Sequence, residues 1–229
     1  MVDIPDGKCR ICGDEFSNTG MTRHLKSCLG KRDARSDEPP DGLLIRASGE
    51  WAPHWLHALA TLDGTLTHLD NFLRSTWVEC CGHLSEFQIG GARYASGGGG
   101  GGFGPSGKSM NVPMGEVLGD GTEFEYIYDF GSSTRLSLKC YGRVTWPDAV
   151  DTADIPDSTS GPVWCVARNL PPELPCEVCG DQADEVCTAC FHRGEGLVCS
   201  DHRDDHDCGH PMFLPAVNSP RMGVCGYTG

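Results

Sequence analysis

An array of paired cysteine and histidine residues near the end of the chain constrains its folding more than any other feature. Three pairs have their members separated by two residues, and three more donors follow: Cys176 and Cys179, Cys187 and Cys190, Cys199 and His202, then His206, Cys208 and His210. Two ligands at this spacing come to one side of a tight turn, as a tetrahedral zinc ion requires. The spacing therefore predicts metal sites in this segment rather than scattered surface thiols.

The order of the pairs predicts two interleaved zinc sites. The pairs at 176/179 and 199/202 close one four-ligand site, and the pair at 187/190 closes the other with His206 and either Cys208 or His210. We favour Cys208 because a thiolate binds zinc well. Eight donors for two ions leave no open position for water or substrate, which predicts a structural role for the metal. The order resembles, in spacing only, the cross-brace of B-box, RING and MYND modules.

A second set of ligands lies near the N-terminus in the pattern C-x2-C-x11-H-x3-C, formed by Cys9, Cys12, His24 and Cys28. This is the spacing of a small zinc finger, in which a hairpin turn carries the first pair and a helix presents the second pair one turn apart. A module of this size cannot fold on apolar burial alone, so metal binding would supply its folding energy. We therefore expect about three structural zinc ions in the protein.

The charge of the chain is strongly acidic but unevenly distributed. The formal net charge is -14, from 32 acidic and 18 basic side chains, and such a surface repels phosphate. Residues 23–35 are the basic exception. Any nucleic-acid contact is therefore expected at the N-terminal finger, and the candidate residues are Arg23, Lys26, Lys31, Arg32 and Arg35. The alternative is a structural finger whose basic face is solvated or meets the acidic remainder of its own chain.

The cysteine spacing also bears on the compartment. Cysteines in metal-like spacings indicate a reducing environment rather than a disulfide framework. The first six residues lack the parts of a signal peptide, and no apolar run approaches the roughly 18 residues that span a bilayer. We expect a cytoplasmic protein without membrane contact.

Between the two cysteine-rich segments, the pattern predicts an α+β domain. Residues 54–61 are expected as a strand, and Thr65 caps a helix whose apolar face is Leu66, Leu69, Phe72, Leu73 and Trp77. A further strand is expected at 84–89. Alternation then predicts a hairpin, with Phe124, Tyr126, Tyr128 and Phe130 on one face and Leu136, Leu138 and Cys140 on the returning strand. A last strand follows at 162–168.

These elements define a fold class and a domain organisation. The class is α+β, with a central mixed or antiparallel sheet and one main helix, flanked by two small zinc-stabilised modules. The expected divisions are a zinc finger at 1–32, a linker at 33–42, the central domain at 43–170 with a flexible glycine-rich loop at 97–112, the two-zinc module at 173–212, and a tail at 213–229 that packs back onto the protein.

Several short runs in the central domain resemble the plasmid pRiA4b ORF-3-like family. They are Trp55-Leu56-His57, the helix Leu66-Thr67-His68-Leu69-Asp70-Asn71-Phe72-Leu73-Arg74, the segment His83-Leu84-Ser85-Glu86-Phe87, and above all Phe124-Glu125-Tyr126-Ile127-Tyr128-Asp129-Phe130-Gly131. The resemblance covers roughly residues 43–170 and implies an association with plasmids and mobile elements, but no reaction. The chain departs from the family after the glycine, where it has Ser132-Ser133-Thr134-Arg135.

Three other groups suggest chemistry that we mostly reject. The run from Gly102 to Ser109 matches a phosphate-binding loop, but it lacks a strand before it and a helix after it, so nucleotide binding is not expected.

Cys80, Cys81 and His83 could join Cys225 in a further metal or redox site. Adjacent thiols make strained chelates, however, so buried core cysteines are the preferred interpretation, and Cys81→Ser would then leave the zinc count unchanged.

A nucleophilic enzyme would need a base held beside its nucleophile. The candidates are the histidines His54, His57 and His68, with Asp70 or Asp129 as orienting carboxylates. On a half-buried strand and an amphipathic helix, such histidines are more often structural.

The leading hypothesis is a non-enzymatic zinc-binding adaptor with a protein partner. The alternatives are a nucleic-acid-binding accessory protein acting through the basic finger, and a metal-assisted hydrolase, which would require an open zinc position.

Overall fold

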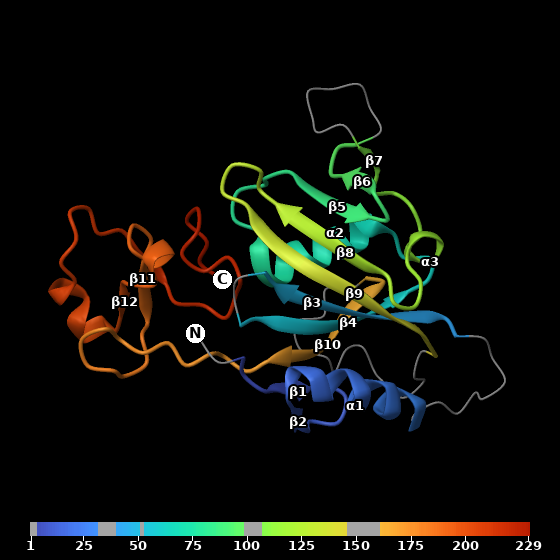
Figure 1. The fold of residues 1–229 in the computed structure, drawn as a ribbon, viewed down its shortest axis with the longest axis horizontal. Helices are drawn as coiled ribbons and strands as arrows, with labels where there is room; N and C mark the ends of the chain where they lie inside the picture. Colours follow the sequence, from blue (N-terminus) through green and yellow to red (C-terminus); the bar gives the residue numbers. More distant parts are fainter. Residues whose placement is uncertain (1–3, 32–39, 51–52, 99–106, 146–160) are drawn as a thin grey trace.

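The computed structural model of the chain describes residues 4–31, 40–50, 53–98, 107–145 and 161–229. It has the predicted α+β architecture, with a sheet of ten strands, a separate sheet of three strands and few helices (Figure 1). The elements of the larger sheet and its helices are β1 (Gly7–Cys9), β2 (Glu15–Phe16), α1 (Asn18–Lys31), β3 (Gly42–Gly49), β4 (Trp55–Thr61), α2 (Leu66–Leu73), η1 (Arg74–Val78), β5 (Ser85–Ile89), β6 (Ala92–Ala95), β7 (Lys108–Ser109), α3 (Met114–Val117), β8 (Glu123–Tyr128), β9 (Thr134–Val144) and β10 (Val163–Asn169).

The larger sheet includes the N-terminal finger. Its order is β2-β1-β10-β4-β3-β9-β8-β5-β6-β7, and every neighbouring pair is antiparallel except β6 with β7. Gly7 of β1 lies opposite Asn169 of β10. A side chain at Gly7 would collide with Trp55, because a Cβ atom built there lies 2.3 Å from the indole ring. The strands of the finger therefore form one edge of the central sheet. The expected linker at 33–42 lies between the finger and the central domain in the sequence, but the two pack together in space.

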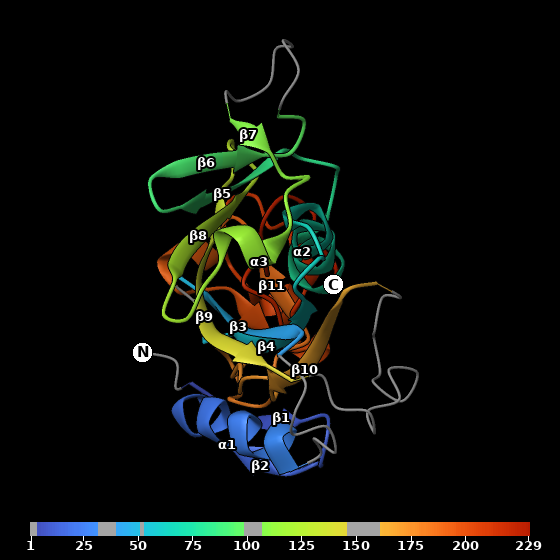
Figure 2. The same ribbon diagram turned by 90° about the vertical axis from the view of Figure 1, so that its right-hand side faces the viewer.

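The central strands are buried on both faces because a helix covers each side (Figures 1 and 2). Leu43 and Ile45 of β3 pack in the core beneath α2, whereas Leu44 packs with Met21 and Leu25 of α1. Residues that alternate along β3 therefore serve two different cores. Double burial explains why β3 and β4 read as nearly continuous apolar runs rather than as alternating patterns.

The local structure differs from expectation in two places. β3, at Gly42–Gly49, is a central strand beyond those that the pattern predicts, because its apolar run Leu43–Ile45 reaches both cores. Phe130 does not share the buried face of Phe124, Tyr126 and Tyr128, since β8 ends at Tyr128. Asp129 then takes a φ of 63°, and the Phe130 side chain is 44% exposed.

The helix and the glycine-rich segment also differ in detail from expectation. α2 ends at Leu73 and continues as the single π-helical turn η1, which keeps Trp77 buried as its spacing predicted. Half of the expected flexible loop at 97–112, residues 99–106, lies outside the described residues, and so does the larger part of the rejected phosphate-binding motif at 102–109. The described end of that loop is structured: Lys108 and Ser109 form β7, and Met110 is buried in the main core.

The C-terminal module consists of short elements around a small core. They are β11 (Glu185–Cys187), η3 (Phe191–Arg193), β12 (Leu197–Val198), η4 (Ser200–Asp205) and β13 (Phe213–Pro215), with β11 central in the smaller sheet. In Figure 1 this module, in orange and red, lies beside one end of the central domain. The segment after β13 returns to that domain, where the Ser219 hydroxyl donates to the Trp77 carbonyl at 2.6 Å.

Among the residues that the structure describes, no helix has both the length and the apolar character needed to cross a lipid bilayer.

Candidate metal centres

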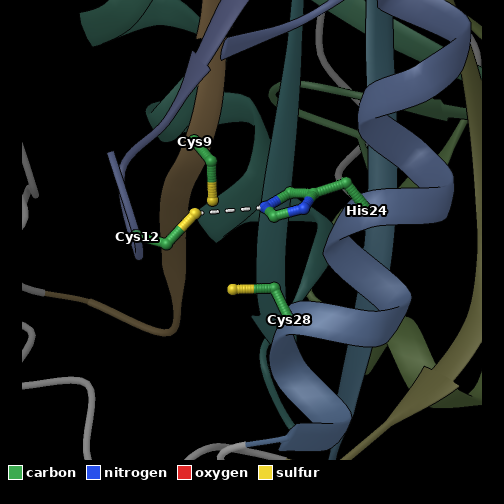
Figure 3. A group of neighbouring side chains, drawn as sticks. All are labelled: Cys9, Cys12, His24 and Cys28. Carbon is green, nitrogen blue, oxygen red and sulfur yellow. Dashed lines mark hydrogen bonds between the residues drawn. The ribbon is translucent and has the colours of Figure 1, made fainter. Parts of the chain in front are cut away.

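The N-terminal finger brings Cys9, Cys12, His24 and Cys28 together, as Figure 3 shows. The Cys12 sulfur lies 3.3 Å from Nε2 of His24, and all four donor atoms lie within 4.8 Å of one another. Cys9 ends β1, and the amide of Gly13 donates back to its carbonyl at 2.8 Å, which closes the turn that carries Cys12. His24 and Cys28 lie one turn apart on α1. The group can hold one four-coordinate metal ion.

Burial and ring stacking act on two of the finger's ligands. Burial raises the pKa of the Cys9 thiol to about 12, and a cation bound there would offset that effect by stabilising the thiolate. The ring of Phe16 stacks on His24 with their centroids 4.0 Å apart, which fixes the orientation of the imidazole.

The first C-terminal tetrad consists of Cys176, Cys179, Cys199 and His202. The sulfurs of Cys179 and Cys199 are 3.8 Å apart, and the Cys199 sulfur is 3.1 Å from Nδ1 of His202. For a tetrahedral ion with metal–sulfur bonds of about 2.3 Å, two sulfur ligands would be separated by about 3.8 Å. The observed separation matches that edge.

The second C-terminal tetrad consists of Cys187, Cys190, His206 and Cys208, with the sulfurs of Cys187 and Cys208 also 3.8 Å apart. Nδ1 of His206 bonds to the Glu177 carboxylate, while Nε2 is buried and has no hydrogen-bond partner among the described residues. A carboxylate on one ring nitrogen commonly orients the other nitrogen toward a metal. His210, the alternative fourth ligand, is exposed and lies outside the tetrad.

Sequence reasoning misjudged a fourth group. Cys80, Cys81, His83 and Cys225 also place their donor atoms within 4.8 Å of one another. The expectation that these cysteines are buried in the core is wrong, because Cys81 and Cys225 are exposed and Cys80 is only partly buried. The adjacent thiols followed by a histidine were the available signal. Cys225, however, lies 142 residues from His83, so no local spacing could include it.

None of the fourteen cysteines, all of which the structure describes, forms a disulfide, and each belongs either to one of these groups or to the core. Each of the four groups contains three cysteines and one histidine. The two remaining cysteines, Cys140 and Cys165, are buried in the main hydrophobic core.

The residues considered as enzyme machinery have other partners. His68 accepts the amide proton of Thr65 on Nδ1 at 3.0 Å and so caps α2. Asp70 accepts the hydroxyl of Tyr126 at 2.7 Å and pairs with Arg74 at 2.9 Å. Asp129 pairs with Arg221 at 2.8 Å. These groups hold the helix, the sheet and the C-terminal segment together.

His54 and His57 are buried and therefore held neutral. Burial, with the positive charge of Arg168 nearby, lowers the pKa of His54 to about 4. Burial, with Arg46 nearby, lowers the pKa of His57 to about 3. Nε2 of His57 bonds to the Thr22 hydroxyl of α1 at 2.8 Å, which joins the central sheet to the finger.

The lowered pKa of His57 predicts that the folded protein loses stability in acid. Below the unfolded value of about 6.5, the unfolded chain binds a proton at His57 that the folded protein does not. The free energy of unfolding is therefore unaffected by His57 above about pH 6.5 and falls as the pH decreases toward 3. At pH 5 the loss due to His57 is about 2 kcal/mol. Urea unfolding of the wild type and of His57→Gln between about pH 7.5 and pH 5 would measure it.

His57→Gln should lose less stability over that interval, whereas His192→Gln, at an exposed position, should follow the wild type. Metal content measured at each pH separates loss of an ion from protonation of His57. Equal slopes in all three proteins would contradict the assignment to His57.

The structure describes part of the basic region predicted for nucleic acid. Arg23 and Lys26 are exposed on α1, Lys31 ends that helix, and Arg32 and Arg35 lie outside the described residues. The Lys26 ammonium lies 5.9 Å from the ring centroid of Tyr141 in β9. Arg46 and Lys139 approach the same ring at 5.8 and 5.7 Å. The positive charge near α1 therefore includes strand residues that the sequence pattern did not single out.

The fold and these sites define a cysteine- and histidine-rich α+β protein whose side chains could hold metal ions in four places. No family model matches the chain, and no curated protein matches it. The resemblance to the pRiA4b ORF-3-like family therefore finds no support in these comparisons.

Among solved structures, the chain is similar to MM3350, a protein of unknown function from Methanosarcina mazei Go1. The identity is 16% and the TM-score 0.40, over 50% of this chain and 67% of that one. Neither the fold nor an activity is taken from a likeness of this size.

Proposed function

We propose that the protein is a zinc-stabilised binding protein without catalytic activity, in which three zinc ions fill the N-terminal tetrad and the two C-terminal tetrads. The observation that carries this proposal is that four soft donors converge in each tetrad. Three thiolates and one imidazole suit zinc, and four protein ligands leave no position for a substrate or an activated water. The ions would hold rigid surfaces for a protein partner on segments too short to build a large core.

Metal analysis of the purified protein tests the proposal. At least three zinc ions per chain are expected. Cys12→Ser should lose one ion. Cys208→Ser should lose two, because the two C-terminal sites are linked: Glu177 lies in the chain between Cys176 and Cys179 of the first site and bonds to His206 of the second. His210→Ala is the matched control and should retain every ion. Zinc contents in Cys12→Ser and Cys208→Ser equal to the wild type would refute the assignment.

A second candidate function, binding of single-stranded nucleic acid, is supported by the surface around Tyr141. We define the Tyr141 surface as Lys26, Arg46, Tyr141, Lys139 and Arg143. Three of its cations lie within 6 Å of the aromatic ring, and Arg143 borders a recess of about 250 Å³ beside Lys26 and Tyr141. Aromatic rings stack on bases while neighbouring cations contact phosphates. Four cations gather here on a protein with a net charge of -14, although Lys139 also pairs with Glu123 at 2.7 Å.

Fluorescence anisotropy with an oligothymidine tests this second candidate. We expect binding that weakens as salt is raised, with a slope that falls by about 0.7 for each phosphate contact removed. Tyr141→Ala should weaken binding at every salt concentration, and Arg143→Ala should reduce the slope.

Arg135→Ala is the matched control for that experiment. Arg135 is half-exposed on the same strand, β9, but pairs with Glu125 and lies outside the Tyr141 surface. Its loss should leave binding unchanged. Absence of binding at low salt, or equal losses in Arg135→Ala and Arg143→Ala, would refute nucleic-acid binding through this surface.

A further inference from the structure

The fourth cysteine and histidine group joins two parts of the chain that are distant in sequence. Cys80, Cys81 and His83 lie on the turn between η1 and β5, and Cys225 lies on the C-terminal segment. Nε2 of His83 is 3.4 Å from the Cys225 sulfur. In the three other groups, the corresponding contacts between donors measure 3.1 to 3.8 Å. The fourth group therefore has the dimensions of the others.

The turn that carries the adjacent cysteines is fixed by its own hydrogen bonds. The Gly82 amide donates to the Glu79 carboxylate at 2.6 Å, and Arg74 holds that same carboxylate at 2.7 Å. Gly82 adopts a φ of 71°, which a glycine takes without strain. Neighbouring thiols can then face one ion together with the histidine that follows the glycine.

The surroundings of the group suit the charge of an occupied site. Zinc with three thiolates and one neutral imidazole carries a net charge of about -1. The Arg221 guanidinium is fully buried and directs Nη2 at the Cys80 sulfur, 3.4 Å away. Arg193 is placed in the same way in the second C-terminal tetrad, with Nη2 3.2 Å from the Cys190 sulfur. An arginine beside one sulfur thus recurs in two of the four groups. Arg221 also pairs with Asp129, whose carboxylate lies 3.6 Å from Nε2 of His83, so both charges belong to the surroundings of the site.

We propose that Cys80, Cys81, His83 and Cys225 bind a fourth zinc ion, which fastens the C-terminal segment to the central domain. The inference shares the choice of zinc with the proposed function but depends on separate donors. No donor of this group is fully buried, whereas each other group contains at least one buried cysteine. The fourth ion is therefore the most accessible to solvent and should be the first that a chelator removes.

Zinc analysis of single variants tests the fourth site. The wild type should contain four ions, and Cys225→Ser, Cys81→Ser and His83→Gln should each contain three. Cys140→Ser and Cys165→Ser are matched controls because these two cysteines lie outside every tetrad, and both should contain four. With a chromogenic chelator, the wild type should release one ion in a fast phase that Cys225→Ser lacks.

Trypsin provides a second measurement that reports the fastening itself. Cleavage after Arg221 requires this buried side chain to leave its four hydrogen-bond partners, Ser132, Thr134, Cys80 and Asp129. We expect faster cleavage there in Cys225→Ser and His83→Gln than in the wild type and Cys165→Ser, as followed by mass spectrometry of the intact chain.

The outcomes separate this inference from the proposed function. Three zinc ions in both the wild type and Cys225→Ser would overturn the fourth site and leave the other three intact. Three ions together with a disulfide between Cys81 and Cys225 in the purified protein would also overturn it, in favour of a thiol pair. Fewer than three ions in the wild type would instead refute the proposed function.

Discussion

Arg221→Met is expected to lower the free energy of unfolding by about 3–5 kcal/mol, because it leaves the Asp129 carboxylate charged, buried and without its partner. Asp129 is 5% exposed and Arg221 is completely buried. The guanidinium also donates to the Ser132 carbonyl at 3.0 Å and to the Thr134 hydroxyl at 2.9 Å. Removing the side chain therefore takes a donor away from two buried groups at once, the Asp129 carboxylate and the Thr134 hydroxyl. Urea unfolding at neutral pH would measure the loss.

Two further variants make this result specific. Asp129→Asn combined with Arg221→Met should recover part of the stability, because the double variant buries no charge at this place. Arg135→Met removes a cation from a half-exposed pair with Glu125, whose closest atoms are 3.9 Å apart. It should have little effect, since exposed ion pairs contribute little. A loss in Arg221→Met no larger than that in Arg135→Met would show that the buried pair does not hold the C-terminal segment.

The second large effect is expected in the C-terminal module. Cys187→Ser removes a ligand from one of two interleaved sites and should unfold the module between residues 173 and 215. Its core is small: the buried cluster consists of Leu174, Ala183 and Val186 with Met222 from the segment that follows, and Val198 is also buried. Structural zinc typically contributes about 10 kcal/mol or more to the folding of such small units, which exceeds what this core can supply.

Hydrogen exchange followed by mass spectrometry would localise that unfolding. Amides of β11 should lose protection in Cys187→Ser, whereas amides of β3 and β4 should keep it, because the main core packs around α2 and does not include the module. Cys165→Ser, a buried cysteine outside the tetrads, is the control and should keep β11 protected. Protection of β11 that survives the loss of Cys187 would show that the module folds without its metal.

Much of the fold could be predicted from the chain because the pattern was local. Leu66, Leu69 and Phe72 recur at helical spacing and form α2, and alternation around Tyr126 identified the hairpin of β8 and β9. β3 could not be recognised in the same way. Its residues face two cores, so they neither alternate nor follow a helical period, and only the presence of a helix on each face makes them a central strand.

The candidate sites divide along the same line. Cys9 and Cys12, or Cys176 and Cys179, are separated by two residues, so one turn of backbone places both thiols on the same side whatever the rest of the chain does. The sequence by itself determined these donor pairs, their interleaved order and the α+β class. Only the tertiary structure decided where Cys225 lies.

Cys225 reaches His83 because the C-terminal segment docks on the central domain. Ser219 binds the Trp77 carbonyl, and Arg221 binds Asp129, a residue with a φ of 63° at the end of β8. Those contacts join positions 142 and 92 residues apart in the chain, and the two donors are 142 residues apart. Contacts between such distant residues depend on the packing of the whole domain, so they cannot be predicted from the spacing of residues along the sequence.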